Sequence, residues 1–175
     1  IGAGLEARRR LRACPTGRRG QVVVMALAAA LVQAPLAEGI AEFKAGRLKE
    51  ARALLEQAVK LEPQRAEAWK GLGAVWAAEG DYERSLPCFQ KACELDPKEE
   101  DACYYLGRNL FSLNRFEAAL EAFGKALEAE GEAKRWRVYR AVAQAQEALG
   151  RAEEAQKSFV EAIRRERGQA RADDD

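Results

Sequence analysis

The sequence of 175 residues contains no histidine. Histidine is the side chain that enzymes use most often as a general base, and it is also a common zinc ligand, so its absence removes the usual means of building either kind of site. The sequence predicts no strands, and therefore no glycine-rich phosphate loop between a strand and a helix. Carboxylate runs at 99–101 and 173–175 are typical of solvated surfaces. We expect no enzymatic activity, no metal site and no cofactor.

Excess charge of one sign is also missing from most of the chain. The net charge is only +1. Residues 1–20 hold six arginines and one glutamate, a charge of +5, which leaves about −4 for residues 21–175. A mildly acidic body does not fit a protein that neutralises phosphates, so we expect no nucleic-acid partner.

Long hydrophobic runs are scarce, and residues 22–32 form an apolar run of only eleven. A membrane-spanning helix needs about 20 such residues. A basic stretch, a short apolar run and small residues after it, here Ala34 and Ala37, are typical of a secretory signal peptide. We therefore assign residues 1–31 as a leader, which favours a periplasmic or secreted protein over a cytoplasmic one.

Two alternatives to export stay open. Residues 22–45 form, in the first alternative, an amphipathic helix that covers the open end of the fold described below. In the second, the leader is an artefact of reading frame or of fragment ends, because the chain begins with Ile1 and not with methionine. Pro35 directly after Ala34 also disfavours cleavage at that point.

Sequence features recur along the chain with a period of thirty-four residues, stretched once to thirty-six. One recurring position favours a left-handed turn, one is always alanine and one is a large apolar residue. A period of this length indicates a stacked array of helical units that bury their apolar faces on one another. The three positions are Gly46, Gly80, Asn114 and Gly150; Ala58, Ala92, Ala126 and Ala162; and Leu55, Phe89, Phe123 and Phe159.

The unit at 66–99 resembles a tetratricopeptide repeat, and the units at 32–65, 100–133 and 136–169 resemble the same family more weakly. The resemblance implies an all-α fold, a right-handed superhelical solenoid of about four antiparallel helix pairs over residues 32–169. We expect an acidic, disordered tail at 170–175. The residues of the best unit that carry the resemblance are Trp69, Leu72, Gly73, Trp76, Phe89, Ala92 and Pro97.

The recurring residues have a physical reason. Glycine, and next to it asparagine, tolerates the left-handed conformation that reverses the chain between the two helices of a unit. Small residues such as Gly73 and Gly107 let two helices approach closely, and the phenylalanines fill the space beside them. Pro87 breaks the pattern, because it falls inside a predicted helix, where we expect a bend or a loose first turn on the outer face.

The four cysteines do not form a disulfide framework. Their spacing suits no zinc site, and we expect small buried thiols. A bridge from Cys93 to Cys103 across the turn between two units is the one geometrically sensible disulfide, and export would favour it.

The resemblance also implies a binding surface, because the first helix of each unit lines the concave face in this family. The corresponding residues predict a groove that binds a protein or peptide with acidic and apolar groups. In the alternative interpretation the aromatic rings pack between units and the arginines pair with nearby carboxylates. The predicted groove residues are Lys70, Tyr104, Arg108, Phe111, Arg137, Arg140 and Gln144.

Other functions can be weighed against this prediction. Family members that clamp the terminal carboxylate of heat-shock chaperones need five polar residues, and only Lys70 matches, with Arg137 as a basic substitute. A chaperone-linked role is therefore not expected. The last unit lacks a polar capping helix, so Val160 and Ile163 could instead dock on a second copy in a homo-oligomeric scaffold. A third alternative is an accessory domain of a larger protein.

Overall fold

The computed structural model describes residues 34–97, 101–129, 131 and 135–173, and all regular structure in these ranges is helical. Contacts divide the chain into residues 1–34 and residues 35–175, and the second unit holds the whole helical array. The predicted leader at 1–31 lies outside the described residues. Within them, no helix is both long enough and apolar enough to span a membrane.

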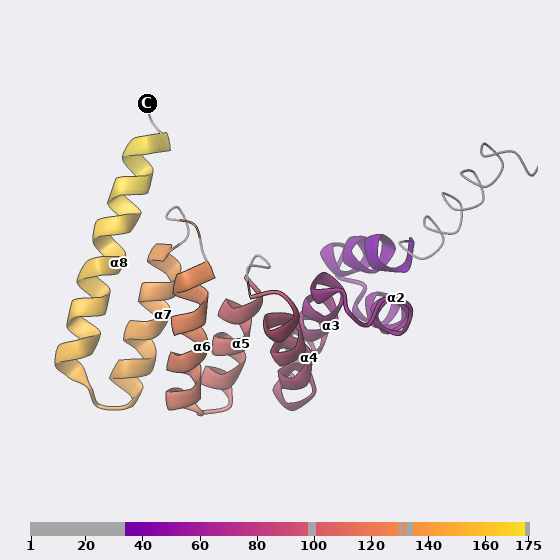
Figure 1. Cartoon of the computed structure of the whole chain (residues 1–175), viewed down its shortest axis with the longest axis horizontal. Coiled ribbons are helices and arrows are strands. Elements are labelled where there is room, and N and C mark those ends of the chain that lie inside the picture. The colour runs from indigo at the N-terminus through magenta and orange to yellow at the C-terminus, as the bar shows by residue number, and fades with distance from the viewer. Residues whose placement is uncertain (1–33, 98–100, 130, 132–134, 174–175) are drawn as a thin grey trace, which may run out of the picture. The chain divides into compact units, whose positions relative to one another are not determined.

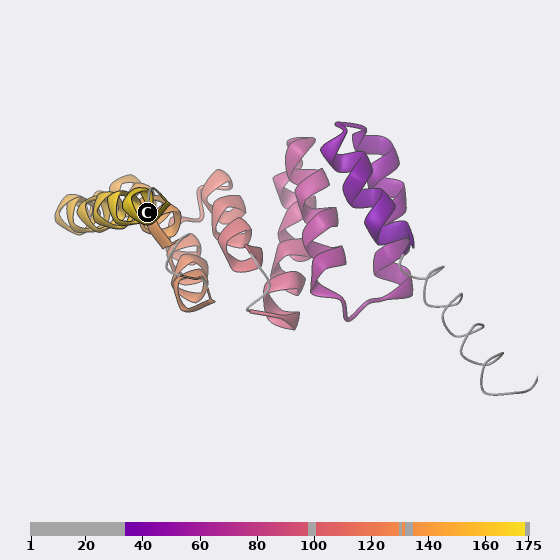
Figure 2. The ribbon, with the colours of Figure 1, turned by 90° about the horizontal axis from the view of Figure 1, so that it is seen from above.

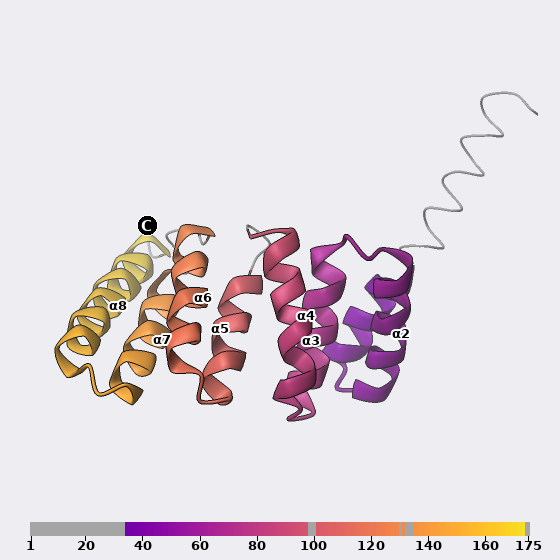
Figure 3. The same cartoon turned by 60° about the horizontal axis from the view of Figure 1, so that its bottom comes forward.

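The helices follow the predicted repeats, with two helices in each unit, and each helix packs on the next along the chain. Figures 1 and 3 show this succession from α2 to α8, and Figure 2 shows α7 and α8 side by side. The predicted all-α solenoid is confirmed. The bounds are 34–44 for the first helix, then α2 Leu48–Leu61, α3 Ala66–Ala78, α4 Tyr82–Leu95, α5 Ala102–Ser112, α6 Phe116–Ala129, α7 Arg135–Ala148 and α8 Ala152–Asp173.

The turn within each unit has the predicted backbone conformation. The residue at the turn has a positive φ in all four units: 77° at Gly46, 83° at Gly80, 57° at Asn114 and 74° at Gly150. After Gly80, the amide of Asp81 donates to the carbonyl of a residue five positions earlier at 2.9 Å, and the other three turns have the same bond at 2.9–3.0 Å. This pattern satisfies carbonyls that the helix end would leave open.

The core is built from the recurring small and aromatic residues. Phe89 and Phe123 are fully buried, and each lies against a glycine of the preceding helix, as predicted. A Cβ atom added to Gly73 would lie only 3.1 Å from the ring of Phe89. Phe159, expected in the core as well, is only half-buried, because it belongs to α8, the last described helix of the array.

Three further expectations can be compared with the structure. Cys93 and Cys103 form a disulfide, so the prediction of free thiols holds only for Cys88 among the described cysteines. Pro87 is exposed, and α4 stays helical through it. Helix α8 continues to Asp173, so residues 170–173 of the predicted disordered tail are helical. Alanine and arginine in this stretch are strong helix formers.

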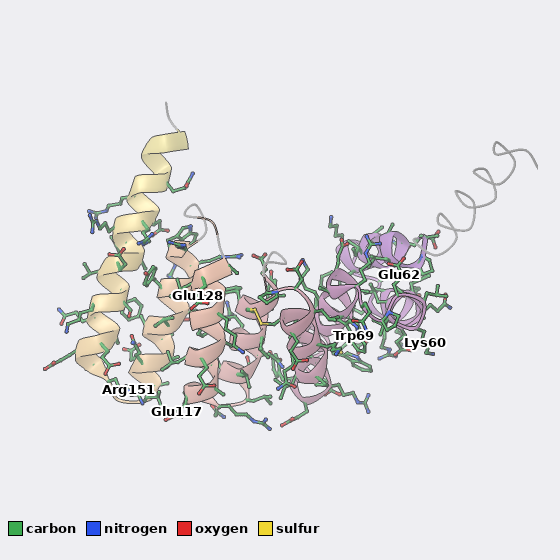
Figure 4. All side chains as sticks on the ribbon, in the orientation of Figure 1. Lys60, Glu62, Trp69, Glu117, Glu128 and Arg151 are labelled. Carbon is green, nitrogen blue, oxygen red and sulfur yellow. A yellow bond between two sulfur atoms is a disulfide. The ribbon has the colours of Figure 1, made fainter. Side chains whose placement is uncertain are left out.

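The helix at 34–44 belongs to the array. Leu36 is buried, and Ile40 and Phe43 pack against the apolar cluster that α2 and α3 form. Trp69 of α3, labelled in Figure 4, donates from its indole nitrogen to the carbonyl of Pro63 at 2.8 Å and so ties α3 to the preceding turn. The first unit is therefore packed on the second through both of its helices.

Candidate partner-binding groove

The structure has a groove between α3 and α5, with a volume of about 580 Å³. The helix at 34–44 also contributes to its lining, as do two residues of α4, Tyr82 and Phe89. We call it the α3/α5 groove. Its lining residues are Ile40, Phe43, Glu67, Lys70, Gly71, Ala74, Ala77, Ala78, Tyr82, Phe89, Asp101, Tyr105, Arg108, Asn109 and Ser112.

The side chains of α3 project little into the groove, because most of them are small. Gly71, Ala74 and Ala77 recur at spacings of three, so they share one face of α3. A large side chain at Ala74 or Ala77 would fill the space that the groove now leaves open. Lys70 lies on the same helix and brings one basic group to this wall.

The α5 side carries the groove's aromatic and polar groups. Tyr105 is 40% exposed, and its ring stacks on Phe89 of α4 with 5.8 Å between centroids. Arg108 is exposed one turn further along, and its Nη1 donates to the hydroxyl oxygen of Tyr104 at 3.2 Å. A guanidinium has five N–H groups, so this bond uses only part of its capacity.

A buried pair of polar side chains, Ser85 of α4 and Asn109 of α5, helps to hold the α5 wall in place. The hydroxyl of Ser85 donates to Oδ1 of Asn109 at 2.6 Å, and Nδ2 of Asn109 donates to the carbonyl of Tyr82 at 2.9 Å. Ser85 is fully buried and Asn109 is 3% exposed. A buried amide must find partners, and these two bonds fix the side chain of Asn109 where it lines the groove.

The structure brings only two of the predicted groove residues, Lys70 and Arg108, into the α3/α5 groove. Tyr104 is buried, with the guanidinium of Arg137 4.6 Å above its ring centroid. Arg137 also forms an ion pair with Asp101, and its partial burial lowers its pKa below the ordinary value. These three residues therefore connect α7 to α5 as part of the packing, as the alternative interpretation of the sequence expected.

The remaining predicted residues lie elsewhere. Phe111 is half-buried and packs edge-on against Phe116, with 5.3 Å between ring centroids. Arg140 and Gln144 are exposed on α7 and do not line the α3/α5 groove. A binding role for these three residues remains a prediction.

Sequence reasoning missed several residues of the groove, among them Tyr105 and Asn109. Tyr105 is adjacent to the predicted Tyr104, and one residue on a helix corresponds to a rotation of about 100°. The signal that could have found it is the spacing of Tyr105, Arg108 and Ser112, which places three groove residues on one face of α5. No local pattern marks Asn109, because its partners belong to α4.

Three family models, each described as tetratricopeptide repeat, match the chain at residues 36–100, 77–142 and 137–169. Together they span the described helices from the first to the last unit. The matches confirm the predicted resemblance to this family.

Solved structures of MamA share the fold. A crystal structure of MamA superposes with a TM-score of 0.76 at 26% identity, over 87% of this chain and 88% of the other. A MamA AMB-1 structure gives a TM-score of 0.70 at 30% identity, over 78% of this chain and 80% of the other. The likeness extends over most of both chains.

Curated relatives match over shorter stretches. Superkiller complex protein 3 of Mus musculus is 31% identical over 56% of this chain, and peroxisome biogenesis protein 5 of Arabidopsis thaliana is 34% identical over 42% of it. The matched parts span only 6% and 10% of these relatives. The repeated fold and its relatives are consistent with a protein-interaction module. The chain belongs to the tetratricopeptide repeat family.

Proposed function

We propose that this chain is a non-catalytic interaction module that binds a peptide or protein segment in the α3/α5 groove. The observation that carries the proposal is the groove itself, which has a volume of about 580 Å³ and lies between α3 and α5, the first helices of two successive repeats. Clefts of several hundred Å³ with apolar walls and a few polar groups are typical of binding sites.

The lining describes the chemistry of the partner. Apolar contacts are offered by Ile40 and Phe43 at one end and by Tyr105 on the α5 wall, over the small residues of α3. Lys70 and Arg108 supply positive charge to the groove from opposite walls. A segment with one or two large apolar side chains and a nearby carboxylate suits this arrangement, because aromatic and arginine residues give most contact energy in interfaces.

Selection from a random peptide library displayed on phage, with the purified chain as bait, tests the proposal. Two double variants serve as matched baits, since each reverses two lysine or arginine charges. The groove variant is Lys70→Glu with Arg108→Glu, and the control is Lys91→Glu with Lys157→Glu on the second helices of two units. A third bait, Ala74→Arg, fills the groove without reversing a charge.

We expect selected peptides to bind the parent and the control equally and to lose most of their affinity for the groove variant and for Ala74→Arg. Binding to the parent should also weaken as salt rises, because carboxylate pairing is screened at high ionic strength. Peptides that bind all four baits alike would refute the groove as the binding site, provided that circular dichroism shows equal helicity.

Self-association is a second candidate function, and one observation favours it. Val160 and Ile163 on α8 are 60% and 48% exposed, and they are spaced to share one helical face. Exposed apolar residues on the last described helix of a repeat array are a surface on which another helix can pack. In light scattering after size exclusion, the parent's mass should then rise with concentration, and Val160→Glu with Ile163→Glu should stay monomeric. A parent that is monomeric at every concentration would exclude this function.

A further inference from the structure

A specific bond joins α4 to α5 at each end of the contact between them. At one end, Cys93 near the end of α4 is joined by a disulfide to Cys103 near the start of α5, with 4.9 Å between their Cα atoms. Figure 4 shows this disulfide in yellow. At the other end, Ser85 and Asn109 form the buried hydrogen bond described above. The disulfide is covalent and can be broken by exchange with a thiol, whereas the hydrogen bond cannot be removed in this way.

This contact holds one wall of the α3/α5 groove. The two walls, α3 and α5, touch each other little, whereas α4 packs extensively against both. On α5, Tyr105 reaches its place in the groove by stacking on Phe89 of α4. The position of the α5 wall therefore depends on how firmly α5 is held to α4.

Open space borders Cys93 on the side of α4 and α6. Two adjoining clefts of about 320 and 390 Å³ lie there, and Cys93 lines both of them, whereas Cys103 lines neither. Both cysteines are buried, with exposures of 4% for Cys93 and 2% for Cys103. The clefts share Cys93, Glu94 and Lys125, and the first is also lined by the apolar residues Leu106, Leu110, Ala118 and Ala122.

We infer that Cys93 is a thiol-exchange site, and that exchange there loosens the α5 wall of the groove. A small thiolate that enters the clefts attacks Sγ of Cys93, forms a mixed disulfide and displaces Cys103 as a thiolate, which takes a proton from water. A second thiolate then attacks the sulfur of the bound thiol and releases Cys93. The net reaction converts two small thiols into their disulfide and leaves two protein thiols. Only the consequence for binding rests on the proposed function.

Reduced glutathione is the probe, applied to the folded chain in a Cys14→Ser, Cys88→Ala background so that the other two cysteines cannot react. Free thiols are then alkylated, and peptide mapping by mass spectrometry locates glutathione and alkyl groups. Amide hydrogen exchange is followed helix by helix before and after the reaction. A second chain, with Ser85→Ala added, lacks the hydrogen bond at the other end of the same contact.

When the reaction is stopped by alkylation early, before the second exchange, we expect glutathione on Cys93 and the alkyl group on Cys103. Amide exchange in α5 should become at least about tenfold faster, while α7 and α8 keep their protection. The chain with Ser85→Ala should show a larger increase. Glutathione mainly on Cys103, unchanged exchange in α5, or equal loss of protection in all helices would each overturn the inference. These measurements need no partner, so they can fail or succeed independently of the peptide selection.

Discussion

Replacement of Gly107 by alanine tests the packing argument most directly. A Cβ atom at this position would stand 2.5 Å from Cδ1 and 3.0 Å from Cγ of Phe123, and closer still to Cε1. Carbon atoms in contact prefer about 3.5 to 4.0 Å. Phe123 is fully buried, and the ring of Tyr104 lies 6.0 Å away between centroids, so the phenylalanine ring has little room to move.

The size of the effect follows from two opposing terms. Overpacking a core costs about 1 to 3 kcal/mol, and a clash with a fully buried ring belongs at the upper end of this range. Alanine in place of glycine inside a helix contributes about 1 kcal/mol in the other direction. We therefore expect Gly107→Ala to lower the free energy of unfolding by about 2 kcal/mol, or the melting temperature by about 6 °C for a chain of this length.

Two other glycines provide matched comparisons. Gly124 lies inside α6, is exposed, and an added Cβ would meet nothing within 4 Å, so Gly124→Ala should stabilise by about 0.5 to 1 kcal/mol. At Gly73 the nearest ring atoms lie at 3.1 Å, and Gly73→Ala should be close to neutral. Urea and thermal unfolding, followed by circular dichroism, give the order. Gly107→Ala as stable as Gly124→Ala would show that helix α5 does not pack on Phe123 at this distance.

Three further predictions concern the turns, a buried thiol and the leader. Gly80→Val should lower the free energy of unfolding by more than about 1 kcal/mol, because a β-branched residue at positive φ is strained. Asn114→Gly should be neutral or slightly stabilising. Equal melting temperatures for Gly80→Val and the parent would contradict this prediction. Burial raises the pKa of Cys88 from an ordinary 9.0 to about 11. The folded chain therefore keeps the thiol proton at pH values at which the unfolded chain loses it. As the pH rises from about 9 to about 11, the free energy of unfolding of the parent should fall by roughly 2 to 3 kcal/mol more than that of Cys88→Ala, as measured by urea unfolding at each pH. If the stability of both chains changes with pH in the same way, the thiol is not buried as described. Deletion of residues 1–31 should leave a fully helical domain with a cooperative thermal transition, if that segment is an export signal; a broad transition would instead make it a structural cap.

The fold could be predicted from the sequence because its signals are local and repeated. The turn at Gly80 needs a residue that accepts positive φ, and the same need recurs at fixed spacing, so one interpretation explains four turns. The pairing of Gly107 with Phe123 was also predictable, since a small residue and a ring recur at constant separation. These features depend on the geometry within one unit, which the period specifies.

The site was less predictable because it depends on contacts between units. Position within the repeat does not show whether Tyr104 or Tyr105 faces the groove, since this depends on how α5 is rotated about its axis against the neighbouring helices. Arg137 was expected to meet a ligand, but Asp101 and the ring of Tyr104 occupy its guanidinium. When a charged or polar side chain pairs with a residue far away in the sequence, the pairing is decided by how the repeats pack on one another.

The turns and the contacts between units set different limits on where a segment of this chain can be exchanged for one from another repeat protein. Cβ atoms added at Gly46, Gly80 and Gly150 would meet nothing within 4 Å, so the turns hold no neighbour in place through a side chain. The α4/α5 contact, in contrast, depends on matched pairs. A block exchanged with another repeat protein should therefore run from turn to turn, over residues 81–113, and carry both members of each pair. A block cut at the repeat boundary, over residues 66–99, would separate every such pair and lose the contact.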